Sequence, residues 1–238
     1  MRFILLQARN PNDLAKIEEQ QSFAQRLNVD IGCIHSVDIL QDELHLDLLL
    51  GSNALLVGGA GEYSVLDNDQ RIKRFISFLG EVSNHQTPTF ASCFGFQALV
   101  LALGGQIVKD VARAEVGTYL LKTTVHAQED VLFSAFPNEF WAQLGHQDQA
   151  SVLPESVIHL ASSERTHYQA FKVKDSPIYA TQFHPELTES DNRKRFARYM
   201  PIYGALFGEE EAQRRMDSHR PSIESNQLLL NFKKQFCQ

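Results

Sequence analysis

Short apolar runs alternate with longer runs of helical spacing between residues 3 and 103, and this alternation constrains the fold more than any other feature. Four strand-type runs lie at Phe3–Leu6, Ile31–Ile39, Ala54–Val57 and Pro88–Ser92. Three helix-type runs are marked by Leu14, Ile17, Ala24 and Leu27, by Ile72, Phe75, Ile76 and Leu79, and by the segment Phe96–Leu103. Strands that alternate with helices usually pair in parallel, in a sheet that helices cover on both faces. We therefore predict an α/β fold with a mainly parallel sheet.

The pattern changes in the second half of the chain. Four β-rich pieces, separated by turn residues, lie at Gly117–Val125, Val157–Ala161, Tyr168–Val173 and Ile178–Phe183. Short strands joined by turns are typical of antiparallel pairing, so we predict a small antiparallel β addition to the same domain.

Helical patterns return after Glu186. We predict a helix at Asn192–Met200, a charged and exposed segment at Glu209–Arg215, and an amphipathic helix after Pro221 that carries Leu228, Leu229, Phe232 and Phe236. We accordingly divide the chain into a main domain, residues 1–200, and a C-terminal helical extension, residues 201–238, packed on the same domain.

The composition excludes several classes of protein. With 43% hydrophobic and 21% charged residues, the chain can bury the core of one large domain. Its formal net charge of −7 and the lack of a large basic cluster argue against nucleic-acid binding. No apolar run is long enough for a membrane span or a signal peptide. Three widely spaced cysteines, Cys33, Cys93 and Cys237, fit neither a disulfide framework nor a metal site, so we expect a cytoplasmic protein without a cofactor.

A cysteine occupies the turn between the fourth strand-type run and the helix-type run that follows it. A thiol at a helix N-terminus faces the positive end of the helix dipole, which favours the nucleophilic thiolate. Gly95 lacks a Cβ, so we expect it to let the chain bend tightly there, as in the elbows that expose hydrolase nucleophiles. An unpaired cysteine can equally be a small buried hydrophobic residue. Cys93 is therefore a candidate nucleophile that needs a partner base.

The best candidate for that base is His184, at the end of the strand-type run Ile178–Phe183. If the backbone stays extended through Pro185, then His184 and Glu186 point to the same side, and the carboxylate can orient the imidazole. A surface His-Pro turn is the competing interpretation, and the chain contains nine histidines. The carboxyl ends of parallel strands lie at one edge of a sheet, so the loop Gly58–Gly61, Cys93 and His184 should meet there.

Together these residues resemble the class I (triad) glutamine amidotransferases. The resemblance spans roughly residues 1–200 and rests on the following matches: Gly58-Gly59, Cys93-x-Gly95-x-Gln97, Arg113-x-Glu115-Val116-Gly117, Trp141 with Gly145-His146-Gln147-Asp148, and Gln182-Phe183-His184-Pro185-Glu186. Within that family, His146-Gln147-Asp148 is similar to a His-Gly-Asp run in the amidotransferase domain of GMP synthetase. The resemblance implies a flavodoxin-like fold of the class I glutamine amidotransferase type.

The resemblance also implies roles for individual residues. Cys93 would attack the γ-carboxamide of glutamine, His184 would transfer protons, and Glu186 would hold His184. The backbone N–H groups of Gly59 and Phe94 would form the oxyanion hole. The implied substrate-binding residues are Gly58, Gln97, Gln147 and Asp148, with Asp148 facing the α-ammonium group. His146 could be a ligand or a structural hydrogen-bonding residue.

The sequence departs from the usual family pattern at two positions near Cys93. Ala91 stands where glycine is usual, and a strand backbone can accommodate its methyl group. Phe96 replaces a histidine and should pack within the helix or reshape the pocket wall. Neither change removes a residue of the expected triad.

Three functional hypotheses follow. The chain after Glu186 is too short for an ATP-pyrophosphatase domain, and no phosphate-binding loop of the Gly-x-x-x-x-Gly-Lys type is present, so we expect any ammonia acceptor to be a separate synthetase. The first hypothesis is therefore a glutamine-hydrolysing subunit that supplies ammonia to that partner. The second is a self-sufficient γ-glutamyl hydrolase or peptidase, whose leaving-group side would be bordered by the loop Ala60–Ser64. The third, a non-catalytic regulatory binding module, is disfavoured by the intact Cys93, His184 and Glu186.

Overall fold

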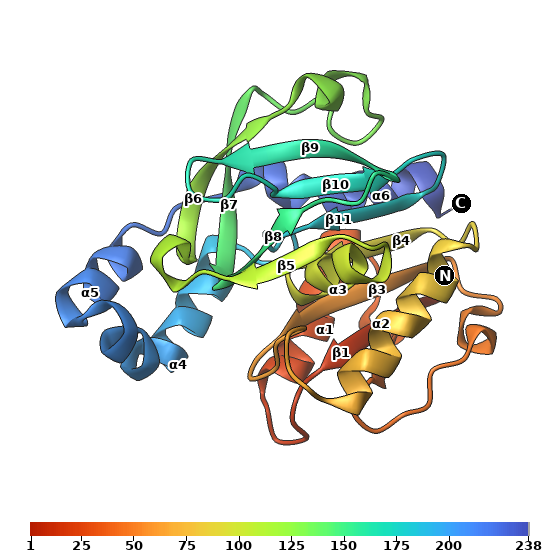
Figure 1. Cartoon of the computed structure of the whole chain (residues 1–238), viewed down its shortest axis with the longest axis horizontal. Coiled ribbons are helices and arrows are strands. Elements are labelled where there is room, and N and C mark those ends of the chain that lie inside the picture. Colours follow the sequence, from red (N-terminus) through yellow and green to blue (C-terminus); the bar gives the residue numbers. More distant parts are fainter. Residues whose placement is uncertain (238) are drawn as a thin grey trace.

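The computed structural model describes residues 1–237, and a nine-stranded sheet runs through the molecule (Figure 1). Its strands lie in the order β2-β1-β3-β4-β11-β10-β9-β6-β7. The first five of these strands are parallel to one another, and the last four continue the sheet with antiparallel pairs. The predicted α/β class, the mainly parallel sheet and its antiparallel addition are confirmed.

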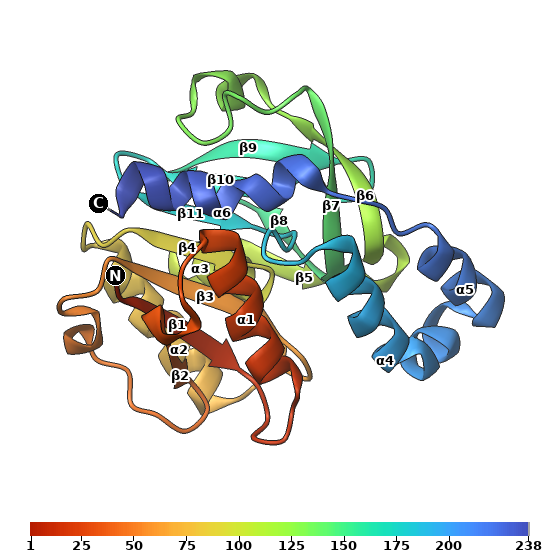
Figure 2. The same ribbon diagram turned by 180° about the vertical axis from the view of Figure 1, so that it is seen from behind.

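Two layers of helices cover the parallel part of the sheet. The strands are β1 (Phe3–Ala8), β2 (Ile34–Asp38), β3 (Ala54–Ala60), β4 (Thr89–Ser92) and β11 (Ile178–Thr181). The covering helices are α1 (Ala15–Leu27), α2 (Gln70–Ser83), α3 (Phe94–Ala102) and α6 (Ile223–Phe236). Helices α2 and α3 lie on the face turned to the viewer in Figure 1, and α1 and α6 lie on the other face, seen in Figure 2.

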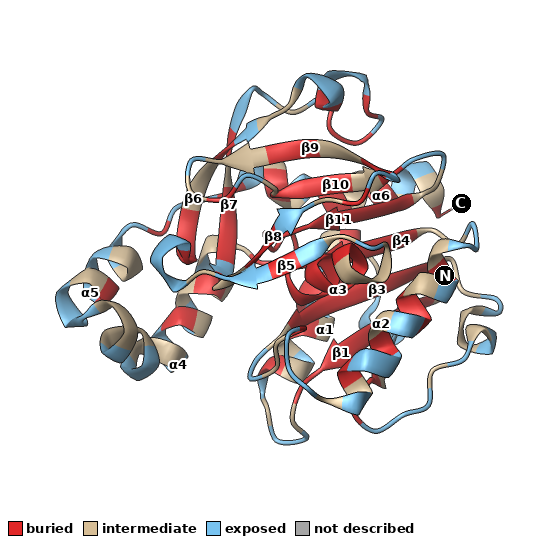
Figure 3. Ribbon diagram, viewed as in Figure 1, coloured by how far each residue is buried: buried red, intermediate tan, exposed pale blue. Residues whose placement is uncertain are grey.

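Alternate residues of each strand supply the two cores, because successive side chains of a strand point to opposite faces. In β1, Ile4 and Leu6 pack with α2 and α3, whereas Phe3 and Leu5 pack with α1 and α6. Figure 3 shows the resulting buried strands in the middle of the molecule. Burial on both faces explains why β1 and β3 read as nearly continuous apolar runs.

The antiparallel part consists of β6 (Glu115–Thr123), β7 (Glu139–His146), β9 (Val157–Ser163) and β10 (Ala170–Val173). A separate two-stranded sheet pairs β5 (Gln106–Lys109) with β8 (Asp148–Val152). Short 3-10 helices lie at Ile31–Cys33, Leu46–Leu49, Val111–Arg113 and Val125–Glu129. The sequence pattern did not predict β5, β7 or β8. Strand β7 contains Gly145 and two polar residues in its middle and end, Gln143 and His146, which weaken its β signal, but it pairs with β6 along its whole length.

Helices α4 (Glu189–Phe207) and α5 (Glu209–Asp217) form a hairpin that extends away from the rest of the molecule (Figures 1 and 2). Thr188 caps α4 with a reciprocal hydrogen-bond pair to Asp191, and the two helices pack on each other and on β6. Most of α5 is exposed (Figure 3). Among residues 1–237, no helix has both the length and the apolar composition needed to cross a membrane.

Three sequence-based details differ from the structure. The predicted strand at Ile31–Ile39 begins only at Ile34, because a 3-10 turn capped by Asp30 precedes it. In α1, Leu14 and Ile17 are exposed, and the buried face instead contains Glu19 and Phe23. The predicted boundary at residue 200 falls inside α4, which continues through Pro201.

Candidate active site

Cys93 lies between the last residue of β4 and the first residue of α3. Its backbone has φ 51° and ψ −100°, so a non-glycine residue adopts a positive φ at the turn. Its N–H donates to Thr181 O at 2.8 Å, which ties the turn to the end of β11. Strained backbone of this kind is typical of residues exposed for reaction at a strand-to-helix elbow.

Gly95 has a role different from the one that we expected. The sharp bend occurs at Cys93 itself, and Gly95 instead permits α3 to approach β3 closely. A Cβ at Gly95 would lie 2.7 Å from Val57 Cγ1 and 3.0 Å from Val57 O. Any larger residue would therefore push the first turn of α3, and the cysteine that precedes it, away from the sheet.

The pairing of β4 with β11 brings His184 and Glu186 to Cys93. The strands run in parallel with Ser92 opposite Thr181, so the segment after each strand emerges at the same edge. His184 Nδ1 lies 2.6 Å from Glu186 Oε1, which leaves Nε2 available to the thiol. The backbone N–H of His184 donates to Gln143 O at 2.8 Å and fixes this segment against β7.

The three side chains form a buried charge network. Cys93, His184 and Glu186 are 7%, 4% and 0% exposed. Burial disfavours the imidazolium form of His184, but the nearby negative charges of Glu186 and Cys93 outweigh it and raise the pKa of His184 to about 9. The arrangement therefore favours a protonated imidazole, which is a proton donor, beside the Cys93 sulfur.

We expect the His184 ring to titrate near pH 9 in an NMR pH series, well above its ordinary value of 6.5. Because the pKa is raised on folding, the protonated ring stabilises the fold fully below about pH 6.5, and this contribution is lost as the pH rises to about 9. Replacing Glu186 by Gln removes the main opposing charge and should move the midpoint down. A wild-type midpoint at or below the ordinary value would contradict the network.

Gly58 and Gly59, at the end of β3, lie beside the imidazole, so the strand continues further than the predicted run Ala54–Val57. A Cβ at Gly59 would lie 3.1 Å from His184 Cε1, so this segment borders the ring of His184. The N–H of Gly59 donates to Glu19 Oε1 at 3.0 Å in this structure. Its use as an oxyanion donor therefore needs that hydrogen bond to be exchanged. Gly58 lies directly over the same carboxylate, which a Cβ would approach to 2.6 Å.

A chain of amides links Cys93 to the remaining substrate-binding candidates. Gln182 Nε2 lies 3.8 Å from the Cys93 sulfur, and Gln182 Oε1 accepts a hydrogen bond from Gln97 Nε2 at 3.2 Å. Gln97 Nε2 also donates to Asp148 O at 2.7 Å. The carboxylate of Asp148 accepts a hydrogen bond from Ser64 Oγ. Gln97 and Asp148 thus share one hydrogen-bond network with Cys93.

His146 belongs to a second, fully internal network. Its Nε2 lies 3.1 Å from Glu115 Oε2, directly across the pairing of β6 and β7, and its Nδ1 lies 3.1 Å from Asp148 O. Glu115 also accepts hydrogen bonds from Ser163 Oγ and Gln169 Nε2. The histidine therefore connects Glu115 to the backbone of Asp148 through hydrogen bonds, the contacts that a structural role requires. The carbonyl of Gln147 accepts a hydrogen bond from the Asp110 N–H.

Three residues with contacts in the site received no individual role from the sequence: Glu19, Ser64 and Gln182. Gln182 lies in a matched motif, and Ser64 ends the loop Ala60–Ser64. A signal was present for Glu19, because Ala15, Glu19, Phe23 and Leu27 recur every four residues, so that the glutamate occupies the buried stripe of α1. Nothing in the local pattern marks Ser64, which depends on the fold of the loop after β3.

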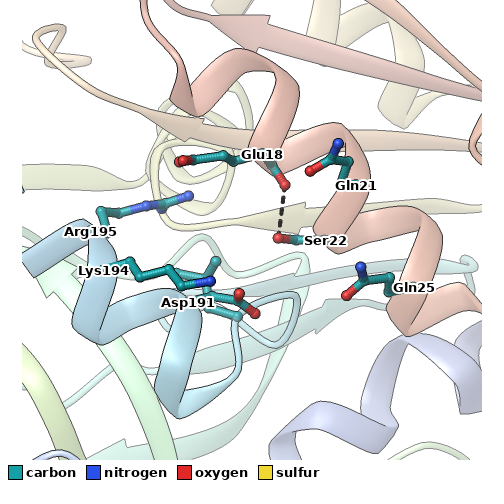
Figure 4. Close-up of a pocket in the computed structure, with 8 residues that line it drawn as sticks. Glu18, Gln21, Ser22, Gln25, Asp191, Lys194 and Arg195 are labelled. Carbon is teal, nitrogen blue, oxygen red and sulfur yellow. Dashed lines mark hydrogen bonds between the residues drawn. The ribbon is translucent and has the colours of Figure 1, made fainter.

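A polar groove of about 260 Å³ lies between α1 and α4, outside the triad (Figure 4). Glu18, Gln21 and Gln25 of α1 face Lys194 and Arg195 of α4 across it. Leu187 also lines the groove, but Cys93 and His184 do not. The Glu18 carboxylate accepts two hydrogen bonds from the Arg198 guanidinium, which join α1 to α4 on the surface. The groove is therefore a helix contact separate from the candidate active site.

Comparisons with known proteins relate most of the chain to one family. Residues 25–200 match the family model described as glutamine amidotransferase class-I. A GMP synthase (glutamine-hydrolyzing) of Thermosipho africanus is 38% identical over 103 residues, 43% of this chain and 19% of that protein. One subunit of the GMP synthase (glutamine-hydrolyzing) of Methanocaldococcus jannaschii is 37% identical over 108 residues, 45% of this chain and 55% of that protein. The chain thus aligns with about half or less of the length of these two curated relatives.

The fold is shared with solved structures. A glutamine amidotransferase of Thermotoga maritima superposes with a TM-score of 0.73 at 17% identity, covering 100% of this chain and 99% of that one. A protein of Thermoplasma acidophilum, described as one subunit of a GMP synthase, gives a TM-score of 0.62 at 24% identity, covering 90% of this chain and 98% of that one. At these identities the likeness concerns the fold alone. Because the family model spans most of the chain, the protein belongs to the class I glutamine amidotransferase family.

Proposed function

We propose that the protein hydrolyses the γ-carboxamide of glutamine through a γ-glutamyl thioester on Cys93 and releases ammonia for a separate acceptor enzyme. The observation that carries this proposal is the strained Cys93 elbow, buried beside the hydrogen-bonded pair His184–Glu186. Relatives that are named as single subunits of GMP synthase support an acceptor on another chain.

The thioester forms in two steps. The Cys93 thiolate attacks the γ-carbonyl carbon, a C–S bond forms, and the carbonyl electrons move onto oxygen. His184 then donates its proton to the amide nitrogen, the C–N bond breaks, and ammonia leaves. Throughout both steps, Glu186 accepts a hydrogen bond from His184 Nδ1 and keeps the ring oriented.

Hydrolysis reverses these roles. His184, now neutral, takes a proton from water, and the hydroxyl oxygen attacks the thioester carbon. The C–S bond breaks, glutamate leaves, and the thiolate–imidazolium pair is restored. The N–H groups of the first turn of α3, which begins at Phe94, have no partner within the helix and can face the oxyanion. Gly59 joins them once its N–H is free.

The bound glutamine is positioned by residues that lie together beside Cys93. We assign its α-ammonium group to the Asp148 carboxylate and its glutamyl end to Gln97 and to the backbone at Gly58 and Gln147. This assignment is supported by the continuous hydrogen bonding from Cys93 through Gln182 and Gln97 to Asp148. A thiol that must stay reduced fits a reducing compartment such as the cytoplasm.

A substrate panel tests the proposal against the γ-glutamyl hydrolase alternative. We expect ammonia release from glutamine with a kcat/KM above that of γ-glutamyl methylamide, γ-glutamyl anilide and glutathione conjugates. The loop at Ala60–Ser64 borders the leaving-group side and should limit larger amines. The Cys93→Ser variant measures the release of ammonia or amine that does not depend on the Cys93 thiol. A higher kcat/KM for the larger leaving groups would instead identify a γ-glutamyl hydrolase.

A further inference from the structure

A buried glutamate lies against Gly58 and Gly59, the glycines at the end of β3 in the candidate active site. Glu19, on the inner face of α1, is fully buried and accepts hydrogen bonds from three sources. Its donors are Gln7 Nε2 at 2.8 Å, the Arg9 guanidinium at 2.9 and 3.1 Å, and the backbone N–H of Gly59 at 3.0 Å. One of these donors, Gly59, belongs to the segment that borders His184.

The close approach of Glu19 depends on the two glycines. A Cβ at Gly58 would lie 2.6 Å from the Glu19 carboxyl carbon, so only glycine leaves room for the carboxylate. A Cβ at Gly59 would contact His184 on one side and stay 3.7 Å from Glu19 Oε1 on the other. The Gly59 peptide is therefore held between the acid and the catalytic imidazole.

The acid keeps its charge in this position. Burial favours the protonated form of Glu19, but the charge of Arg9 outweighs it and lowers the pKa of Glu19 below its ordinary value. Arg9 is itself buried, with a second ion pair to Asp13. A hydrogen bond from an N–H to a charged carboxylate is stronger than one to a neutral carbonyl. Bound substrate, whose γ-carbonyl is neutral, therefore cannot easily draw the Gly59 N–H away.

We propose that Glu19 is a positioning residue that holds the Gly59 N–H away from the reacting carbonyl, so that this N–H reaches the oxyanion only by leaving Glu19. The inference rests on the proposed function, because it concerns the oxyanion of that reaction. The exchange takes place as charge develops on the substrate oxygen, and it limits the rate at which the thioester forms.

For the variant Glu19→Gln, the proposal predicts the direction of the change in kcat. The substitution keeps the size of the side chain but offers Gly59 a neutral acceptor, so the N–H is released more easily. It also removes a negative charge near the developing oxyanion and leaves the positive charge of Arg9. Both effects favour the transition state and leave ground-state binding alone. We expect kcat for glutamine to rise about tenfold at constant KM, a part of the roughly 10²–10³-fold that one oxyanion donor contributes.

Glu18→Gln is the matched control. Glu18 directly precedes Glu19 in α1, its side chain is partly exposed, and it forms an ion pair with Arg198. It should leave kcat unchanged. Alkylation of Cys93 by iodoacetamide is a second control, because the thiolate displaces iodide without forming an oxyanion. Its rate should be equal in wild type and Glu19→Gln. A fall in kcat, or no change, in folded Glu19→Gln would overturn the proposal.

Glu19→Gln leaves the buried charge of Arg9 without its main partner, which could unfold the protein. Two further measurements test the proposal even if that variant does not fold. The double variant Arg9→Gln/Glu19→Gln removes both buried charges and should also raise kcat. A crystal structure of the wild-type protein with glutamate γ-semialdehyde added to Cys93 gives an answer without any substitution. At a pH at which the adduct oxygen is ionised, it should accept a hydrogen bond from Gly59 N, and Glu19 should have lost it. An adduct in which Gly59 still donates to Glu19 overturns the proposal, whereas failure of Cys93 to form any adduct would count against the proposed function itself.

Discussion

Replacing Cys93 by Ser is expected to lower kcat for glutamine hydrolysis by about 10⁴-fold or more, the scale on which nucleophile substitutions act in triad hydrolases. The serine hydroxyl fits the same turn, but it ionises far less readily than a thiol and forms no stable charge pair with His184. Ammonia release at saturating glutamine measures the loss, and thermal unfolding of both proteins establishes that the fold is intact.

The matched control for this prediction is Cys33→Ser. Cys33 is a free, half-buried cysteine in the 3-10 turn before β2, and it is distant in sequence from Cys93. Its substitution should leave kcat unchanged. Residual turnover near the wild-type rate in Cys93→Ser would show that another group is the nucleophile.

Replacing Phe232 by Ala is expected to lower the free energy of unfolding by about 3–5 kcal/mol, as for other fully buried aromatic residues. Phe232 is 0% exposed, and its ring lies edge-on to Phe90 of β4, 5.4 Å between centroids. It also contacts Tyr179 of β11. These two strands lead directly into Cys93 and His184, so the loss should be accompanied by lower activity. Urea unfolding followed by circular dichroism measures the change.

Phe236→Ala is the control on the same helix, because this ring is only partly buried and packs at the edge of the cluster. Its cost should be clearly smaller. Equal and small costs for the two variants would indicate that α6 is a detachable extension. The predicted large difference would show instead that residues 223–236 complete the core of the main domain.

Much of the parallel half of the fold could be predicted from the sequence, because its strands are buried on both faces. Phe3–Leu6 and Ala54–Val57 are continuous apolar runs, and the stripe of Ile72, Phe75 and Leu79 has helical spacing. The antiparallel half gave weaker signals. The run Glu139–His146 mixes polar and small residues and becomes a strand only because β6 lies beside it. β6 is the preceding strand, but a long connection that contains a 3-10 helix joins the two, so no short hairpin turn marks the pairing in the sequence.

The position of Cys93, His184 and Glu186 relative to one another could be predicted because it depends on topology. Parallel strands end at one edge of a sheet, and β4 and β11 are neighbours there. Glu19 could not be predicted with the same reasoning. The spacing of α1 indicates that Glu19 is buried, but its close approach to Gly58 and Gly59 is a contact between separate elements that no local spacing predicts.

The central claim is tested most directly by mass spectrometry of the protein quenched in acid during turnover of glutamine. We predict that the peptide containing Cys93 carries one added γ-glutamyl group, which disappears when glutamine is exhausted and is absent from the Cys93→Ser variant. Ammonia release by the wild-type protein with Cys93 unmodified, or with the glutamyl group on another residue, would contradict it.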